Sequence, residues 1–115
     1  MKHLRETEKN LLFLNAGDHF QGTFWYTIKK SEVVAEFVSL MNHDVMALGN
    51  HEFDDGTEEL RSFIDKVTTT NSNLSILCCN LDIDPRSPLY NKVKNSTVRI
   101  IEGVPIGIIG INCNK

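Results

Sequence analysis

Two stretches of the same design constrain most strongly what this chain can fold into. Each begins with a short apolar run, passes through a glycine and continues into polar side chains that could bind a metal or move protons. The first stretch covers residues 11–23 with Gly17 at its break, and the second covers residues 45–56 with Gly49 at its break. Open α/β sheets place their ligand sites at the carboxyl ends of their strands. We therefore expect two buried strands, at 11–14 and 45–48, each ending in a polar site loop.

The segment between these stretches supports a parallel arrangement of the two strands. Apolar residues recur at helical spacing over residues 31–41, and Ser31 is a suitable N-cap, so we expect an amphipathic helix there. Strand, helix and strand in this order form a βαβ unit with a right-handed crossover. Such a unit places both loops at one edge of the sheet. A plainer alternative is that residues 49–56 form only a polar turn, with Asp55-Gly56 as its turn pair.

The rest of the chain predicts further elements of an α/β fold. Residues 4–10 could end a helix, and a second helix begins near Thr57 with a third strand following at residues 74–79. The buried face of that second helix is expected to comprise Leu60, Phe63, Ile64 and Val67. Residues 81–90 hold two prolines and should be irregular. Residues 98–101 and 104–111 read as two strands joined by a tight turn, and Gly107 and Gly110 suggest close packing or a bulge.

Composition excludes several classes of protein. The chain has 115 residues, so it forms one domain or part of one, and its 41% hydrophobic content is enough for a core. Its net charge of −3 without a basic block disfavours nucleic acid and anionic membrane surfaces as partners. No apolar run approaches the roughly 20 residues of a membrane helix. Residues 1–9 lack an apolar core region, so no signal peptide is expected.

The three cysteines cannot form a complete disulfide set. Cys78 and Cys79 are adjacent and would face opposite sides of a strand, so we interpret them as packing residues. No spaced cysteine pairs typical of zinc ligation occur. Two glycosylation sequons, which begin at Asn73 and Asn95, support a secreted source weakly.

The polar loops carry two motifs, Gly-Asp-x-x-Gln-Gly-Thr at 17–23 and Met-Ala-Leu-Gly-Asn-His-Glu-Phe-Asp at 46–54. Gly-Asn-His-Glu alone is typical of calcineurin-like metallophosphoesterases, and together the two motifs resemble the 5′-nucleotidase/apyrase family within that group. The resemblance runs through the chain from Leu11 onward. It implies that residues 1–115 are part of an N-terminal metallophosphoesterase domain, a partial α/β/β/α sandwich. The family's first strand and its C-terminal substrate domain are not matched.

The resemblance implies roles for four residues. In the family, the aspartate that Asp18 matches bridges two metals, and the asparagine that Asn50 matches is a ligand of the second. The histidine that His51 matches is not a ligand; it forms a dyad with the aspartate that Asp54 matches. Such a histidine can stabilise developing charge or protonate a leaving oxygen. Asn50 and His51 are therefore also expected to bind substrate.

The implied function is hydrolysis of nucleoside phosphates (AMP, ADP or ATP) at a site holding two divalent metal ions. Zinc is the first choice of metal, with manganese, magnesium or calcium as alternatives. The family location is extracellular or at the cell surface, no nucleic acid or membrane segment is implied, and the oligomeric state stays open. The family's Asp-x-His strand and its later histidine ligands have no match, since no histidine follows His51. An inactive nucleotide- or metal-binding fragment is therefore the alternative, followed by a structural remnant without a ligand.

Other polar and aromatic residues receive weaker interpretations. Phe24, Trp25 and Tyr26 on a loop could stack a base, but we expect them to pack beneath the loop. His19 is expected to bind no metal, although it could line the site. His43 and His3 are expected at the surface. Asn80, at the end of the third strand, could face the substrate.

Overall fold

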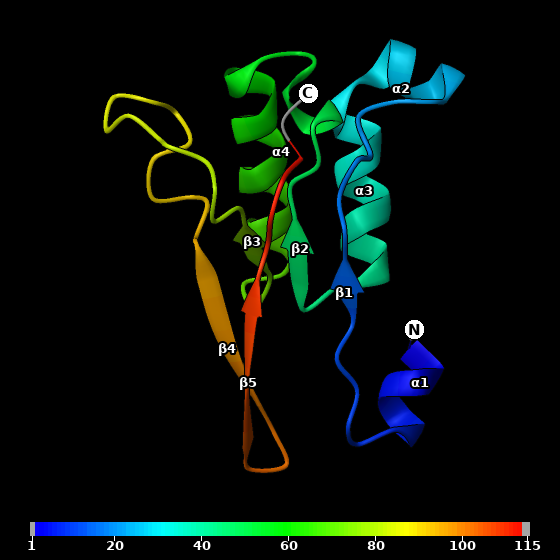
Figure 1. Ribbon diagram of the computed structural model, residues 1–115. Helices are drawn as coiled ribbons and strands as arrows, with labels where there is room; N and C mark the ends of the chain where they lie inside the picture. The colour runs from blue at the N-terminus through cyan, green and yellow to red at the C-terminus, as the bar shows by residue number, and fades with distance from the viewer. Residues whose placement is uncertain (1, 114–115) are drawn as a thin grey trace.

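A three-stranded parallel sheet in the order β1-β2-β3 organises the structure (Figure 1). The structure is a computed structural model that describes residues 2–113. Its helices are α1 (Lys2–Thr7), α2 (Phe24–Lys29), α3 (Ser31–Met41), α4 (Thr57–Thr70) and the short 3₁₀ helix η1 (His51–Phe53). Its strands are β1 (Leu14–Asn15), β2 (Val45–Ala47), β3 (Ser75–Leu77), β4 (Ser96–Ile101) and β5 (Val104–Ile109).

The strand register brings all three carboxyl ends of the sheet to one edge. Leu14 pairs with Val45 and Val45 with Ser75, so the parallel strands start level with one another. Helix α3 lies between β1 and β2 in the chain, and α4 lies between β2 and β3. The expected α/β fold built from βαβ units is confirmed, although β1, β2 and β3 are shorter or shifted by a few residues relative to the prediction.

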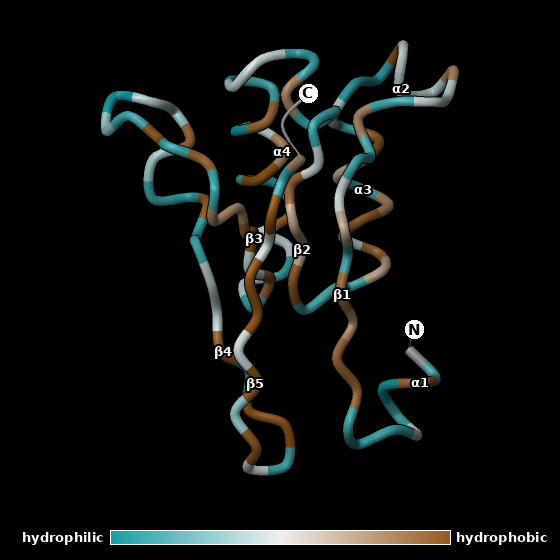
Figure 2. The backbone as a smooth tube through the Cα atoms, in the orientation of Figure 1, coloured by the Kyte–Doolittle hydropathy of each residue, from teal (hydrophilic) through white to brown (hydrophobic). Residues whose placement is uncertain are grey.

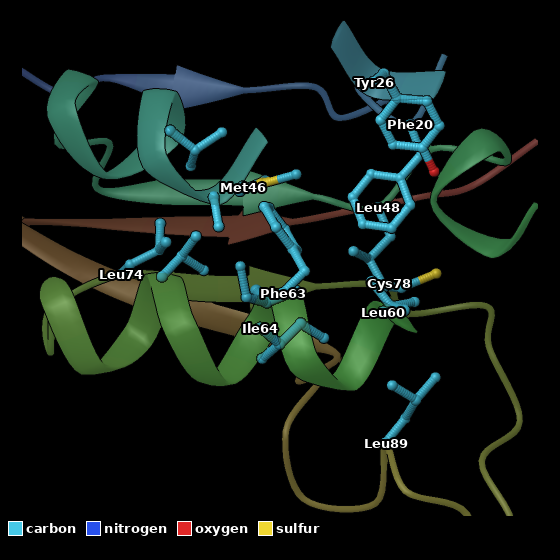
Figure 3. Packing of buried hydrophobic residues seen from close by; sticks show 14 residues of the cluster. Phe20, Tyr26, Met46, Leu48, Leu60, Phe63, Ile64, Leu74, Cys78 and Leu89 are labelled. Atoms are coloured by element: carbon cyan, nitrogen blue, oxygen red, sulfur yellow. The ribbon is translucent and has the colours of Figure 1, made fainter. Parts of the chain in front are cut away.

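Helices α3 and α4 pack side by side over one face of the sheet (Figures 1 and 3). In Figure 3 the side chains of Leu60 and Phe63 on α4 point toward those of Leu48 and Met46. The predicted apolar face of α4 is buried in full: Leu60, Phe63, Ile64 and Val67. Burying each such side chain contributes roughly 1.5–3 kcal/mol. This helix face therefore stabilises the packing of α4 against the sheet.

Residues 24–26 begin a helix rather than lying on a loop. Thr23 has extended backbone and its hydroxyl accepts a hydrogen bond from the Tyr26 N–H at 3.1 Å, which caps α2. Tyr26 is buried beside Phe20, with ring centroids 5.5 Å apart. Phe24 and Trp25 are 72% and 66% exposed. The prediction that these aromatics pack inward is therefore right for Tyr26 and wrong for the other two, because successive residues of a helix point in different directions and only Tyr26 faces the core.

The β4–β5 hairpin is an antiparallel sheet of its own that lies beside the three-stranded sheet, with β4 in contact with β3 (Figure 1). Its turn is the predicted Glu102-Gly103, and both residues have positive φ, 48° and 81°. A Cβ on Gly110 would lie 2.7 Å from the Leu77 carbonyl oxygen, so the close packing expected of this glycine is present. Gly107 faces open space, so the same expectation is wrong there.

Arg99 ties the hairpin to the parallel sheet. Its guanidinium donates to the Asp44 carbonyl oxygen at 2.9 Å, to the Ser75 hydroxyl at 3.0 Å and to the Asn73 carbonyl oxygen. These acceptors lie around the starts of β2 and β3. One side chain therefore serves polar groups on two connections at once.

The β4–β5 hairpin and the residues after it contain many hydrophobic residues (Figure 2), and several of their side chains are exposed. The exposed members are Val98, Ile100, Val104, Ile109 and Ile111. A groove of about 280 Å³ separates β5 from β1 and is lined by Leu14, Val45, Leu77 and Ile108 among others. No helix in the described part of the chain is long and apolar enough to cross a membrane.

His43 is buried, which contradicts the expectation of a surface position. It is 4% exposed and stacks on Phe13 with ring centroids 4.2 Å apart, because the segment entering β1 lies against it. Burial lowers the pKa of the His43 imidazole below its usual range, and the charge of His19 lowers this pKa further. The other residue expected at the surface, His3, is exposed.

The interpretation of the adjacent cysteines as packing residues is right for Cys78, which is buried, and wrong for Cys79, which is exposed. The Cys113 thiol is exposed as well.

Replacing Arg99 with methionine should destabilise the protein by about 1–3 kcal/mol, because two part-buried acceptors, the Asp44 carbonyl and the Ser75 hydroxyl, lose their donor together with the exposed Asn73 carbonyl. The measurement is the free energy of unfolding from urea titration followed by circular dichroism. Arg86→Met is the matched control, since Arg86 pairs only with its neighbour Asp84 on the surface in the described structure. Equal losses in the two variants would contradict the anchoring role of Arg99.

The free energy of unfolding should fall as the pH drops from about 7.5 to about 5.5. The unfolded chain binds a proton at His43 near the ordinary pKa of about 6.5. The folded chain binds this proton only at lower pH, because burial lowers the pKa of His43. Urea titrations across this range should show a weaker pH dependence in His43→Gln and an unchanged one in His3→Gln. Identical slopes in all three proteins would refute the assignment.

Candidate functional site

The loops that follow β1 and β2 meet at the carboxyl edge of the sheet. The His51 N–H donates to the Asp18 carboxylate, with 3.1 Å between N and Oδ1. The backbones approach so closely that a Cβ on Gly17 would lie 2.5 Å from the Ala47 carbonyl oxygen. A Cβ on Gly49 would lie 2.6 Å from Asp18 Oδ1. The convergence expected from parallel strands is therefore present, and it requires glycine at both positions.

Asp18 adopts an unusual backbone conformation. Its φ is +70°, in the left-handed region that non-glycine residues seldom occupy, although aspartate tolerates it better than most. The preceding Gly17 also has positive φ, and its N–H donates to Asn15 Oδ1 at 2.8 Å. This turn directs the Asp18 carboxylate toward the second loop, where it meets the His51 N–H.

Glu52 lies in the seam between the loops and is fully buried. Its carboxylate accepts hydrogen bonds from the N–H groups of Asp18 (2.8 Å), His19 (2.5 Å) and Gly49 (2.6 Å). The sequence motif contains this glutamate, but no role was predicted for it. A signal was available: it is an acidic residue three positions after a strand-ending glycine, where unpaired N–H groups need an acceptor.

His51 and Asp54 form the pair that the resemblance implies. The His51 Nδ1 and the Asp54 Oδ2 are 2.6 Å apart, and the single turn of η1 places them on the same side. Asp55, the neighbouring acid, points elsewhere and accepts from the Tyr26 hydroxyl and from Lys30 Nζ at 2.8 Å. These two hydrogen bonds lower the pKa of the Asp55 carboxyl, and the one from Lys30 has the larger effect. The two adjacent acids therefore serve different partners.

His19 turns away from the Asp18 carboxylate. Its Nε2 is 2.7 Å from Asn15 Oδ1, and Asn15 Nδ2 in turn lies 3.3 Å from Nε2 of His43. His19 and Asp18 also border a pocket of about 360 Å³. The other walls of that pocket are mostly side chains of α2 and α3: Trp25, Tyr26, Val33, Val34, Phe37, Val38 and Met41.

Residues after β5 complete the edge near Asn50. Asn80 makes two hydrogen bonds with the Asn112 backbone, at 2.7 and 2.9 Å, and Asn112 Nδ2 donates to the Gly49 carbonyl oxygen at 3.2 Å. The Cys113 Sγ lies 3.8 Å from Asn50 Oδ1. Asn80 thus joins strand ends in this structure, and its predicted contact with substrate stays a prediction. Asn112 and Cys113 were not predicted, since no motif spacing marks them.

The side-chain oxygens at this edge are suitable ligands for a divalent cation, but they would fill only part of its coordination shell. Carboxylate and amide oxygens such as those of Asp18 and Asn50 are ligands that hard divalent cations accept. Within residues 2–113 no three or more His, Cys, Asp or Glu side chains gather closely enough to hold an ion. The roles of Asp18, Asn50, His51 and Asp54 as ligands or catalysts therefore stay predictions, although the structure brings their loops together.

Comparison with known proteins places the chain among phosphoesterases. Residues 1–107 match the family model of the calcineurin-like phosphoesterases. The chain is 41% identical over 114 residues to a 5′-nucleotidase of Mus musculus and 39% identical over 111 residues to an apyrase of Tabanus yao. Each alignment covers 96% of this chain and 19% of the relative.

Solved structures agree with this placement. A 5′-nucleotidase precursor from Thermus thermophilus superposes with a TM-score of 0.83 at 31% identity, and an NAD nucleotidase from Haemophilus influenzae with 0.85 at 34%. Each match covers 96% of this chain and 21% of the solved chain, so the chain spans about a fifth of its relatives' length. The chain belongs to the calcineurin-like phosphoesterase family.

Proposed function

We propose that this chain contributes part of a two-metal site that hydrolyses nucleoside phosphates. The observation that carries this proposal is the contact between the Asp18 carboxylate and the His51 N–H, with His51 paired to Asp54 beside it. The names of the relatives, 5′-nucleotidase and apyrase, support a nucleotide substrate such as AMP, ADP or ATP. The family location, extracellular or at the cell surface, is part of the same proposal.

Asp18 and Asn50 are the proposed metal ligands. Calcineurin-like phosphoesterases use divalent metal ions, and zinc is our first choice, with manganese, magnesium or calcium as alternatives. When bound, two such ions neutralise charge on the phosphoryl oxygens and lower the pKa of a bound water. Asp18 is suited to its role because its backbone is fixed by hydrogen bonds and its carboxylate faces the second loop.

His51 is the proposed acid or charge stabiliser. Its short contact with Asp54 orients the imidazole and favours a proton on Nδ1. When the imidazole is cationic, its Nε2 can donate to a phosphoryl oxygen or to the leaving oxygen of the ester. Asn50, directly before it in the chain, could hydrogen-bond the same phosphate through its amide.

A catalytically inactive metal- or nucleotide-binding role is the second candidate function. It is favoured by the small donor set, since the described residues offer two proposed ligands and no larger cluster of His, Cys, Asp or Glu. Turnover separates the two candidates, because both predict binding of a divalent cation at Asp18 and Asn50.

A chimera tests the proposed function, because the chain spans only about a fifth of its relatives. The aligned segment of the Mus musculus 5′-nucleotidase is replaced by this chain, and phosphate release from AMP and ADP is measured with added zinc or manganese. We expect turnover by the chimera. Asp18→Ala, Asn50→Ala or His51→Ala should each lower its kcat/KM by about 100-fold or more.

Asp82→Ala is the matched control in the same chimera, since Asp82 is an exposed acid outside both loops. It should leave kcat/KM unchanged. Binding of the cation without turnover in a folded chimera would favour the inactive alternative. Full activity in the Asp18→Ala chimera would refute the proposed ligand role.

A further inference from the structure

We propose that Glu52 is a positioning residue, whose buried carboxylate clamps the Asp18 loop onto the Asn50–His51 loop. The inference rests on the proposed function for its catalytic meaning, because the site it orders is the proposed metal site. It assigns a task to the one acidic residue of the second motif that neither the ligand set nor the His51–Asp54 pair uses.

The Glu52 carboxylate is buried among backbone N–H groups that donate to it. The side chain is 0% exposed, and a buried carboxylate is costly unless hydrogen bonds or a charge compensate it. Among the residues that the structure describes, no Lys, Arg or His forms an ion pair with it. Its compensation comes instead from the N–H groups of Asp18, His19 and Gly49.

These donors belong to two different strand ends. Asp18 and His19 follow β1, whereas Gly49 follows β2. Glu52 Oε2 accepts from Asp18 and Gly49 together, and Oε1 accepts from His19. One carboxylate therefore crosslinks the two loops at the point where their backbones already touch.

The clamp also supports the strained turn at Asp18. The left-handed backbone at this residue persists only where neighbouring contacts hold it. Two consecutive N–H groups of the turn, those of Asp18 and His19, are held by Glu52. Losing this acceptor would free the turn and move the Asp18 carboxylate away from the His51 N–H.

Glu52 does not itself contact a ligand. Both of its oxygens are occupied by backbone donors and the side chain has no exposed surface. Its effect must therefore pass through Asp18 and the Asn50–His51 loop. Residues that do not bind a metal but orient its ligands typically lower the metal affinity by about 10–100-fold when they are replaced.

The test compares the unaltered 115-residue chain with Glu52→Gln, Glu52→Asp and the control Glu36→Gln, whose carboxylate is exposed on α3. Glutamine keeps the size of the side chain but places an NH₂ group against N–H donors. Aspartate keeps the charge but is too short to reach both loops. The readouts are the amide signals of Asp18, His19 and Gly49 in ¹⁵N–¹H spectra, their hydrogen exchange, and the dissociation constant for Mn²⁺ alone.

We expect all three amides to exchange slowly and resonate downfield in the unaltered chain. Glu52→Gln should shift them upfield and weaken Mn²⁺ binding by about tenfold. Glu52→Asp should change the same signals in the same direction, and Glu36→Gln should change neither readout. If Glu52→Gln does not fold, Glu52→Asp and the exchange rates of the unaltered chain still decide the question.

Fast exchange at Asp18 and Gly49 in the unaltered chain would overturn the proposal. So would folded variants that lose thermal stability while they keep the three amide signals and the Mn²⁺ affinity. If the amide signals change as expected but the unaltered chain binds no Mn²⁺, the clamp stands and the proposed metal function fails.

Discussion

The hydrogen bonds at the Glu52 carboxylate are the interaction on which the candidate site depends. Parallel strands bring two loops to one edge but leave the backbone N–H groups at their ends without partners. Glu52 supplies an acceptor to both strand ends, and Gly17 and Gly49 leave no Cβ to keep the backbones apart. The positions of Asp18 and His51 follow from this seam, so the motif encodes a backbone arrangement as well as a set of reactive side chains.

The core and the site share the same supports. Helices α3 and α4 hold the sheet from one face, and the capped helix α2 places Tyr26 where its hydroxyl reaches Asp55. Because Asp55 is occupied there, Asp54 is left to pair with His51. The β4–β5 hairpin is packed less completely than these helices, because it leaves apolar side chains exposed. It is anchored to the parallel sheet through Arg99.

Periodicity and motif made the sheet, helices α3 and α4 and the convergence of the loops predictable. The apolar face of α4 and the strand ends depend on local pattern, which sequence shows directly. Three features were not predicted. The Thr23 cap turned an aromatic run into a helix, the entering segment at Phe13 buried His43, and Glu52 reached backbone partners on the loop after β1. Each depends on a contact or cap geometry that local composition does not show.

Paramagnetic broadening by Mn²⁺ tests whether Asp18 and Asn50 face one cation at the carboxyl edge of the sheet. Mn²⁺ is added in small amounts to the ¹⁵N-labelled chain and the loss of each amide signal is recorded. We predict that the signals of residues 17–19 and 49–51 disappear first. First losses at the acidic start of α4, at Glu58 and Glu59, with the two loops unaffected, would contradict it.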